Sequence, residues 1–239
     1  MSAATHIQTA ARIRVMPRTD EARDVATAQL PLRSSAPLPF SEQTTTSWGR
    51  VKRQRSSLAT PAFLDQIPRV LSAEPDRKLL GLGLGRSYGD SCLNEGGALI
   101  DMTALDRVVA FDPITGIIRA EAGLSLSELL RIVVPHGWFL PTTPGTRFVT
   151  LGGAIANDVH GKNHHAAGTL GSSVRRLCLH TSTIGAREIS PSVNAELFRA
   201  TIAGLGLTGL IAWVELQLVR IPGAFLGAEN VAFSGFAEF

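Results

Sequence analysis

A stretch of alternating glycines is followed directly by basic and hydroxyl side chains. It is GLGLGRSYGDS, residues 81–91, and it places Arg86 and Ser87 after three glycines and an apolar pair. Glycine permits positive φ and close approach of the backbone, and successive amides can form a nest for an anion. The loop is therefore either a phosphate site or a tight turn with a structural arginine.

The glycine spacing differs from the dinucleotide fingerprint. That fingerprint is G-x-G-x-x-G at the start of a helix, whereas Gly81, Gly83 and Gly85 give G-x-G-x-G. The residues after Gly85 are turn-like, and no amphipathic helix begins there. A Rossmann site is therefore disfavoured.

Two further glycine stretches lie later in the chain. Thr150 predicts a helix cap, and Gly152 and Gly153 follow it at the start of an apolar helix. Such a helix start either meets a phosphate or flat ring, or packs closely against a neighbour. The segment GLGLTGLI, residues 204–211, precedes a strand and offers the same two interpretations: backbone against a cofactor, or close strand packing.

The segment HGKNHH, residues 160–165, holds three histidines and a lysine. A metal site is disfavoured because His164 and His165 are adjacent and point apart, and no cysteine completes a ligand set. We expect no metal. The segment is either a polar loop that faces a substrate or cofactor, or a solvated loop.

The elements expected to position these residues mix hairpins with helices, which predicts an α+β fold rather than regular βαβ repeats. Ser125 and Glu128 form a capping box, and the turn residues of 112–116 separate the strands of the first of two expected hairpins. The expected helices cover 62–71, 126–133 and 194–203, and the expected strands cover 79–84, 98–101, 107–111, 116–122, 174–182, 187–190 and 210–219.

Composition favours a packed domain. The chain has 239 residues, 44% of them hydrophobic, and a net charge of +3. Much of the basic excess lies before residue 56 without interleaved aromatics, so we expect no nucleic-acid partner. No apolar run reaches a bilayer-spanning length and no secretory signal is present, which predicts a cytoplasmic protein with membrane association left open. Residues 1–45 are expected to be a poorly ordered arm, 46–221 the domain, and 222–239 the start of another domain.

In order along the chain, these stretches resemble the FAD-binding domain of the PCMH-type (vanillyl-alcohol oxidase) flavoenzyme superfamily, and within it the decaprenylphosphoryl-ribose oxidases. The motifs that carry the resemblance are GLGRSYGDS, ALIDMT, PGTRFVTLGGAIANDVHGKNHHAAGTLG, AELFRAT and GLTGLI. The resemblance implies two α+β subdomains that hold FAD between them. It also implies a further substrate domain, which this sequence lacks as given, so we expect a truncated or split product.

The resemblance also implies the site residues. Asp90 matches a position where many relatives bind flavin covalently through histidine, so non-covalent FAD is expected. His160 and Lys162 match residues that face substrate. The implied cofactor contacts are Gly81, Gly83, Gly85, Arg86, Ser87, Tyr88, Gly89, Asp90, Ser91, Gly145, Thr150, Gly152, Gly153, His160, Gly161, Asn163 and Ile211.

The implied chemistry is oxidation of a secondary alcohol of a sugar, the 2′-hydroxyl of a polyprenylphosphoryl ribose, by hydride transfer to flavin N5. The implied partners are a reductase or a separate chain that supplies the substrate domain. The alternatives are an aldonolactone or alditol oxidase of the same superfamily, and a flavin-binding remnant without turnover. Two residues depart from the pattern: Leu205 stands where relatives carry asparagine, and Asn157 where the decaprenylphosphoryl-ribose oxidases carry cysteine.

Overall fold

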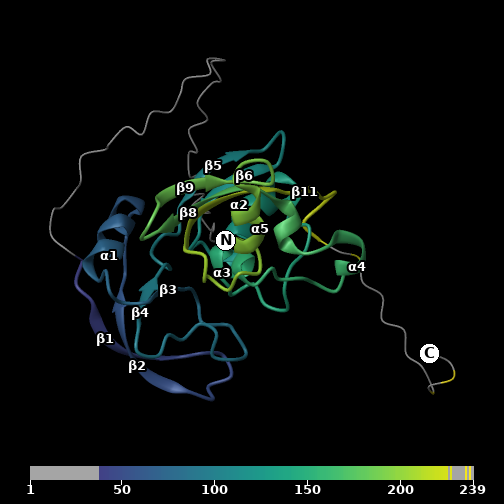
Figure 1. Cartoon of the computed structure of the whole chain (residues 1–239). Helices are drawn as coiled ribbons and strands as arrows, with labels where there is room; N and C mark the ends of the chain where they lie inside the picture. The colour runs from purple at the N-terminus through teal and green to yellow at the C-terminus, as the bar shows by residue number, and fades with distance from the viewer. Residues whose placement is uncertain (1–37, 226, 228–234, 236, 238–239) are drawn as a thin grey trace, which may run out of the picture. The chain divides into compact units, whose positions relative to one another are not determined.

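The computed structural model describes residues 38–225, 227, 235 and 237, and these form an α+β fold with two main sheets (Figure 1). The first sheet has the order β1-β2-β4-β3, the second β5-β6-β10-β8-β9, and β7 pairs with β11. The strands are β1 (Ser41–Thr46), β2 (Arg53–Ala59), β3 (Leu79–Leu82), β4 (Ala98–Asp101), β5 (Val108–Asp112), β6 (Ile117–Glu121), β7 (Trp138–Phe139), β8 (Val174–Thr181), β9 (Gly185–Ile189), β10 (Leu210–Gln217) and β11 (Val219–Arg220). The helices are α1 (Ile67–Ala73), α2 (Leu126–Val133), α3 (Leu151–Ala156), α4 (His164–Ala167) and α5 (Ala195–Thr201). The expected α+β class is confirmed.

The first sheet combines two pairing modes. β1 is antiparallel to β2, whereas β4 is parallel to both β2 and β3. Ile67 and Val70 of α1 pack with Ile100 of β4 and with Leu210 and Ala212 of β10. The helix therefore contacts both sheets, and Leu79 of β3 packs against the same cluster.

The second sheet is antiparallel throughout, with β10 at its centre between β6 and β8. One face is covered by α2, α3 and α5, which contribute Leu129, Ile155 and Phe198 to a single buried cluster. The amide of Glu128 donates to the Ser125 hydroxyl at 3.1 Å, so the expected cap of α2 is present. The two predicted hairpins, β5–β6 and β8–β9, are also confirmed.

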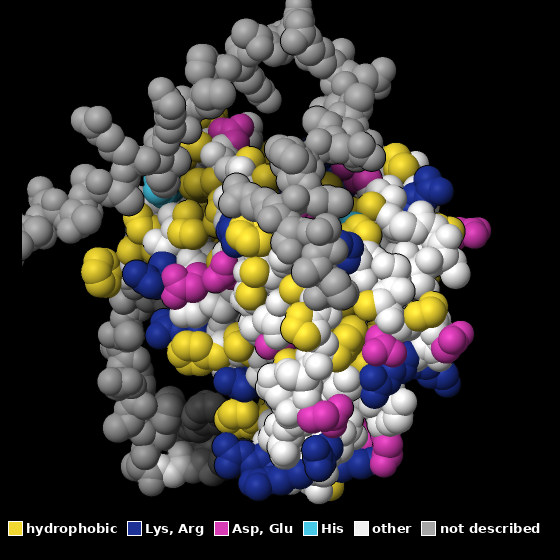
Figure 2. All heavy atoms as spheres, turned by 90° about the vertical axis from the view of Figure 1, so that its left-hand side faces the viewer, with side chains coloured by type: hydrophobic (Ala, Val, Ile, Leu, Met, Phe, Trp, Pro, Cys, Tyr) yellow, Lys and Arg dark blue, Asp and Glu magenta, His cyan; other side chains and the backbone are white. Residues whose placement is uncertain are grey.

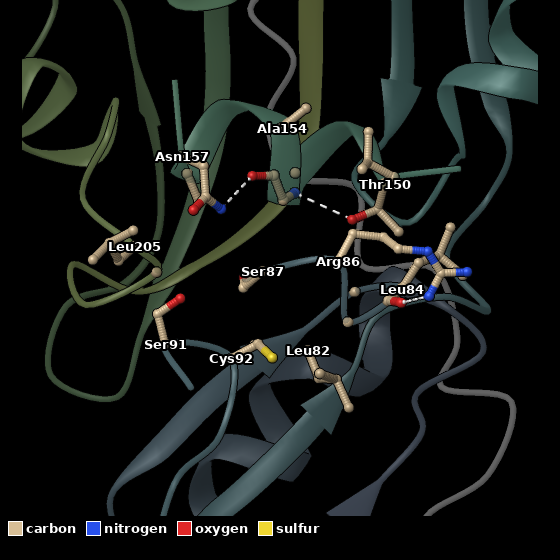
Figure 3. Close-up of a pocket in the computed structure, with 18 of the residues that line it drawn as sticks. Leu82, Leu84, Arg86, Ser87, Ser91, Cys92, Thr150, Ala154, Asn157 and Leu205 are labelled. Atoms are coloured by element: carbon tan, nitrogen blue, oxygen red, sulfur yellow. Dashed lines mark hydrogen bonds between the residues drawn. The ribbon is translucent and has the colours of Figure 1, made fainter. Parts of the chain in front are cut away.

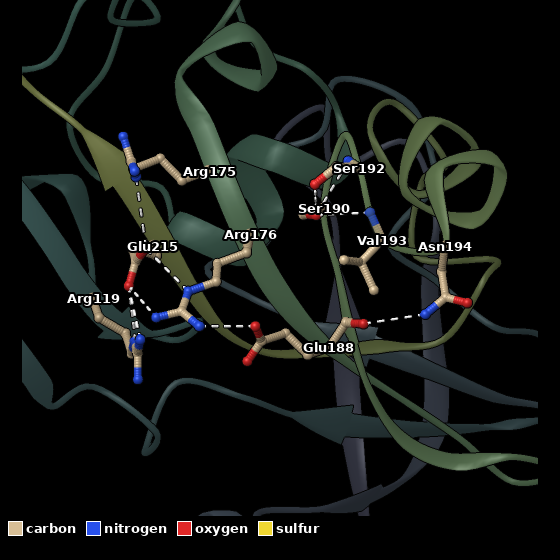
Figure 4. A network of polar contacts seen from close by, with 9 residues as sticks. All are labelled: Arg119, Arg175, Arg176, Glu188, Ser190, Ser192, Val193, Asn194 and Glu215. Atoms are coloured by element: carbon tan, nitrogen blue, oxygen red, sulfur yellow. Dashed lines mark hydrogen bonds and ion pairs between the residues drawn. The ribbon is translucent and has the colours of Figure 1, made fainter. Parts of the chain in front are cut away.

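The opposite face of the second sheet carries a network of charged side chains (Figure 4). Glu215 on β10 stands across from Arg119 on β6 and Arg176 on β8, and it accepts from them at 2.8 and 3.0 Å. Arg176 also donates to Glu188 at 2.8 Å, and Arg175 lies 3.7 Å from Glu215. Burial opposes ionisation of Glu215, but the hydrogen bonds from Arg176 and Arg119 outweigh it and lower the pKa of this carboxyl.

Two of the expected boundaries need correction. Ser41–Thr46 is a strand paired with β2, not part of a poorly ordered arm, because its β-branched threonines suit a strand and β2 supplies the ladder. The expected helix at residues 62–71 begins at Ile67, because the Gln66 side chain accepts from the amides of Ala62 and Phe63 and closes a turn there. The rest of the arm, residues 1–37, lies outside the described residues.

Two further expectations concern the ends of this region. Most of 222–239 lies outside the described residues, so the start of another domain there stays a prediction. Within the described part of the chain, no helix is long and apolar enough to cross a membrane.

Candidate ligand-binding site

A cavity of about 510 Å³ lies within the described part of the chain. Its wall comes mainly from three segments: the loop at 81–92, residues 144–159 around α3, and residues 205–211 at the start of β10. Figure 3 shows Leu82, Ser91 and Cys92 on one side, with Thr150, Ala154 and Asn157 along α3 on the other. The volume falls within the range of about 300–1,000 Å³ that small-molecule sites occupy.

Glycine is required where the loop after β3 passes α3. A methyl group on Gly83 would collide with the hydroxyl of Thr150, so no larger residue fits without a shift. Gly85 adopts φ +63°, a conformation that glycine tolerates best. The first and second glycine stretches of the sequence therefore meet at one point of the cavity wall.

α3 is placed by close packing at its own glycines. Thr150 caps the helix, since its hydroxyl accepts from the amide of Gly153 at 3.2 Å. A methyl group on Gly152 would lie 2.8 Å from the Cβ of Ala122, so the helix crosses the residue after β6 at minimal distance. These contacts fix one wall of the cavity with backbone rather than with long side chains.

Arg86 is the one charged side chain among the described residues that line the cavity. Its guanidinium donates to the carbonyl of Leu84 at 2.5 Å and lies 5.7 Å from the ring centre of Trp48. No ion pair joins it to a carboxylate within the described residues. The cavity therefore offers an uncompensated positive charge, which suits an anionic ligand.

Cys92 gives the cavity a neutral thiol. Burial raises the pKa of this thiol, the charge of Asp90 adds to the rise, and a hydrogen bond with Ser87 opposes it. The thiol therefore stays protonated at neutral pH.

Most of the predicted cofactor contacts come together at the cavity. Those that line it are Gly81, Gly83, Gly85, Arg86, Ser87, Tyr88, Ser91, Gly145, Thr150, Gly152, Gly153 and Ile211. The predicted cofactor contacts that do not line it are Gly89, Asp90, His160, Gly161 and Asn163. Neither of the two predicted catalytic residues, His160 and Lys162, lines the cavity.

The histidine loop begins at the cavity and then leaves it. Asn157 and Val159 line the cavity, whereas His160 and Lys162 are exposed. The side chain of Asn163 donates to the carbonyl of Pro141 at 2.9 Å and accepts from the Thr142 hydroxyl at 3.1 Å, which holds the loop against residues 141–142.

The imidazole rings of this loop contact one another edge to face. The ring centres of His160 and His164 lie 5.1 Å apart in an edge-on arrangement. The described residues contain no group of three or more side chains placed to hold a metal ion.

Other lining residues were not among those predicted. Trp48, Cys92, Met102, Asn157 and Leu205 belong to this group. Cys92 directly follows the first glycine loop, and Leu205 lies within the third glycine stretch. Their closeness to these glycines in the sequence could therefore have predicted that they line the cavity. Trp48 reaches the cavity from the β1–β2 turn, where its amide donates to the carbonyl of Ser87 at 3.1 Å.

Comparison with known proteins agrees with this geometry. Residues 58–183 match the model of a family described as the FAD binding domain. The chain is 38% identical to the decaprenylphosphoryl-beta-D-ribose oxidase of Mycolicibacterium smegmatis over 201 residues, which cover 82% of this chain and 44% of that protein.

Two other relatives are named as a lactone oxidase and a lactone dehydrogenase. Bovine L-gulonolactone oxidase is 31% identical over 66% of this chain and 36% of its own length. Rice mitochondrial L-galactono-1,4-lactone dehydrogenase 1 is 28% identical over 77% of this chain and 32% of its own length. The chain spans less than half of the length of each of these relatives.

Proposed function

The chain belongs to the family of FAD-binding domains, whose cofactor is FAD, and from this premise we propose that the cavity holds FAD without a covalent bond and serves the oxidation of a secondary alcohol of a sugar. The observation that carries the proposal is the convergence of three separate glycine stretches on one cavity, with Arg86 as the single cation among the described residues of its wall. FAD needs such a site, since it combines a diphosphate with two flat aromatic ring systems.

The residues of the cavity fit this cofactor. At Gly83, a side chain would fill the space between the loop and Thr150, so the loop exposes its backbone there. Arg86 supplies the charge, and the hydroxyls of Ser87 and Ser91 can donate to phosphate oxygens. Leu82 and Val149 supply apolar surface for a ring. No histidine lines the cavity within the described residues, which supports non-covalent binding.

Bound FAD supplies an acceptor for an electron pair. In our proposal, His160 accepts the proton of the substrate hydroxyl while the carbinol hydrogen leaves with its electron pair, and Lys162 stabilises negative charge that develops on the oxygen. Both residues belong to the loop that begins at the cavity edge after Val159. Imidazole suits the first role because it exchanges protons near neutral pH.

The 2′-hydroxyl of a polyprenylphosphoryl ribose is our first candidate substrate. It is favoured by the 38% identity to an oxidase named for decaprenylphosphoryl-beta-D-ribose. The lactone oxidase and dehydrogenase relatives favour a second candidate, an aldonolactone or alditol. A reductase that acts on the keto product and a chain that supplies a substrate domain are the partners we propose.

Binding of FAD is tested with a pair of arginine variants. The full chain is purified, freed of flavin and titrated with FAD by fluorescence quenching. We expect Arg86→Gln to raise the Kd of FAD about 10- to 100-fold, because a hydrogen bond to a charged group contributes about 1.5–3 kcal/mol. Arg147→Gln, which removes an exposed cation outside the cavity wall, is the control and should change little. A wild-type chain that takes up no FAD refutes the proposal.

Substrate oxidation is tested by anaerobic bleaching of the bound flavin. A panel of polyprenylphosphoryl ribose analogues, aldonolactones and alditols is added to the FAD-loaded chain. The first candidate predicts bleaching by the ribose analogues alone, and His160→Gln should slow bleaching about 100-fold or more without changing the Kd of FAD. Bound FAD that no alcohol reduces would instead indicate a flavin-binding segment without turnover.

A further inference from the structure

The turn between β1 and β2 exposes apolar and basic side chains together. Val51 at its tip is 91% exposed and Trp48 is 57% exposed. Arg50, Arg53 and Arg55 are exposed beside them. We name these five residues the hairpin surface. Figure 2 shows Lys and Arg side chains gathered at the lower end of one face of the molecule, at the level of the β1–β2 hairpin in Figure 1.

The charge of the hairpin surface is uncompensated. Residues 43–57 contain four basic and no acidic side chains. Lys52 is paired with Glu95, but no ion pair engages Arg50, Arg53 or Arg55 within the described residues. The three arginines therefore present a positive patch to solvent, unlike those of the Glu215 network.

The fold holds this turn in place. The carbonyl of Ser47 accepts from the amide of Arg50 at 3.1 Å, and the Thr46 hydroxyl donates to the carbonyl of Lys52 at 2.9 Å. Trp48 is joined through its amide to Ser87 in the first glycine loop. The exposed tip is thus a fixed projection from the cavity wall.

We propose that the hairpin surface docks the protein on an anionic lipid bilayer. An aliphatic tip beside tryptophan, surrounded by cations, matches what the interface of such a bilayer accepts: tryptophan at the headgroup level, apolar side chains just below it, and arginine on the phosphates. Nucleic acid suits the surface less well, because Trp48 is the one aromatic ring among its five residues and already has Arg86 over it, and Val51 at the tip is not a platform on which a base can stack.

Docking here brings one wall of the cavity to the membrane, because Trp48 belongs to both the hairpin surface and the cavity wall. A lipid-linked sugar could then reach the cavity without leaving the bilayer. That consequence rests on the proposed function, whereas docking itself does not.

Vesicle flotation of the full, FAD-loaded chain tests the proposal. We expect the wild type to float with vesicles of equal parts phosphatidylglycerol and phosphatidylcholine, to stay behind with phosphatidylcholine alone, and to be released by high salt. Arg53→Glu/Arg55→Glu should lower the partition coefficient at least about 30-fold, since each cation near an anionic surface contributes about fivefold. Val51→Asp should lower it as well.

The matched control is Arg187→Glu/Arg199→Glu. It makes the same change of net charge at exposed positions on β9 and α5, and it should float like the wild type. The FAD content of each variant is measured separately, so failure to bind cofactor is distinguished from failure to dock. Three results would overturn the proposal: a wild type that does not float, a hairpin variant that floats like the control, or a single-stranded oligonucleotide bound as tightly as the anionic vesicles.

Discussion

The cavity and the charged face of the second sheet use arginine in opposite ways. On the sheet, Arg176 donates to both Glu215 and Glu188, and Glu215 also accepts from Arg119. In the cavity, Arg86 donates to a backbone carbonyl and has no carboxylate partner within the described residues. One region neutralises its charges internally, whereas the other keeps a cation available.

The difference extends to the backbone. The sheet network is built from long side chains that cross neighbouring strands, so its geometry follows from the register. The cavity is built from glycines, and its geometry depends on contacts such as Gly83 on Thr150. We infer that the network serves stability and the cavity serves binding. Substitutions in the two regions should therefore separate stability from FAD affinity.

The largest effect is expected at the glycine contact. Gly83→Val forces its side chain into Thr150. Overpacking of this kind costs about 3 kcal/mol. If the loop shifts to relieve it, the cavity wall is displaced and the Kd of FAD should rise about 100-fold. Gly89→Ala is the control, because no atom lies near the added methyl group and Gly89 does not line the cavity. Fluorescence titration measures the Kd of FAD for both variants. Equal values would contradict the inference that the cavity serves binding.

The next effect is expected in the charged network. Glu215→Gln leaves three arginines close together around a neutral amide and should lower the free energy of unfolding by about 2 kcal/mol, with the Kd of FAD unchanged. Denaturant unfolding measures the loss. Glu128→Gln, which breaks an exposed pair with Arg131, should cost less than about 0.5 kcal/mol. Weaker FAD binding by Glu215→Gln would contradict the separation of the two regions.

A smaller effect is expected at a buried histidine that does not line the cavity. His180 is 7% exposed, and its Nδ1 has no hydrogen-bond partner within the described residues. Burial lowers the pKa of His180 below its ordinary value of 6.5. The unfolded chain therefore binds the proton first, and stability should fall as the pH drops below about 6.5.

His180→Leu should flatten this decline between pH 6.5 and the lower, folded-state pKa. Thermal melts across that range measure it. His136→Gln, at an exposed histidine, should leave the decline in place. A profile that His180→Leu does not alter would assign the decline to other groups.

The smallest effect is expected at a strained residue of the cavity. Leu205 adopts φ +53°, which costs a leucine about 1 kcal/mol but suits asparagine. Leu205→Asn should therefore raise the free energy of unfolding by about 0.5 kcal/mol without weakening FAD binding. Leu207→Asn makes the same chemical change at an exposed residue without positive φ and should give no gain.

Local chemistry allowed much of the fold to be predicted. The Ser125 cap, the turn at Asp112–Gly116 and the alternation along β10 all act over a few residues, and each is present. The second half of the predicted capping box is not, because the Glu128 side chain pairs with Arg131. The strand at Ser41–Thr46 was missed because its neighbours are rich in proline and serine. It is held by pairing with β2, and pairing does not appear in local composition.

Part of the cavity could also be predicted from local sequence, because its walls contain glycine stretches. Glycine stretches indicate where backbone must approach closely, and all three of them line the cavity. Whether Asp90 or His160 also faces it depends on how each loop leaves the wall. That direction is set by contacts such as Asn163 with Pro141 and Thr142, which no spacing rule encodes.

The central place of β10 has a consequence for biosynthesis. β5–β6 and β8–β9 are hairpins that can form early, but each needs an edge of β10, whose last residue is Gln217. While the chain emerges from the ribosome, the two hairpins cannot join into one sheet until this strand arrives. Closure of the sheet is therefore a late, nonlocal step of high contact order, and β6 and β8 expose unpaired edges to aggregation until it occurs.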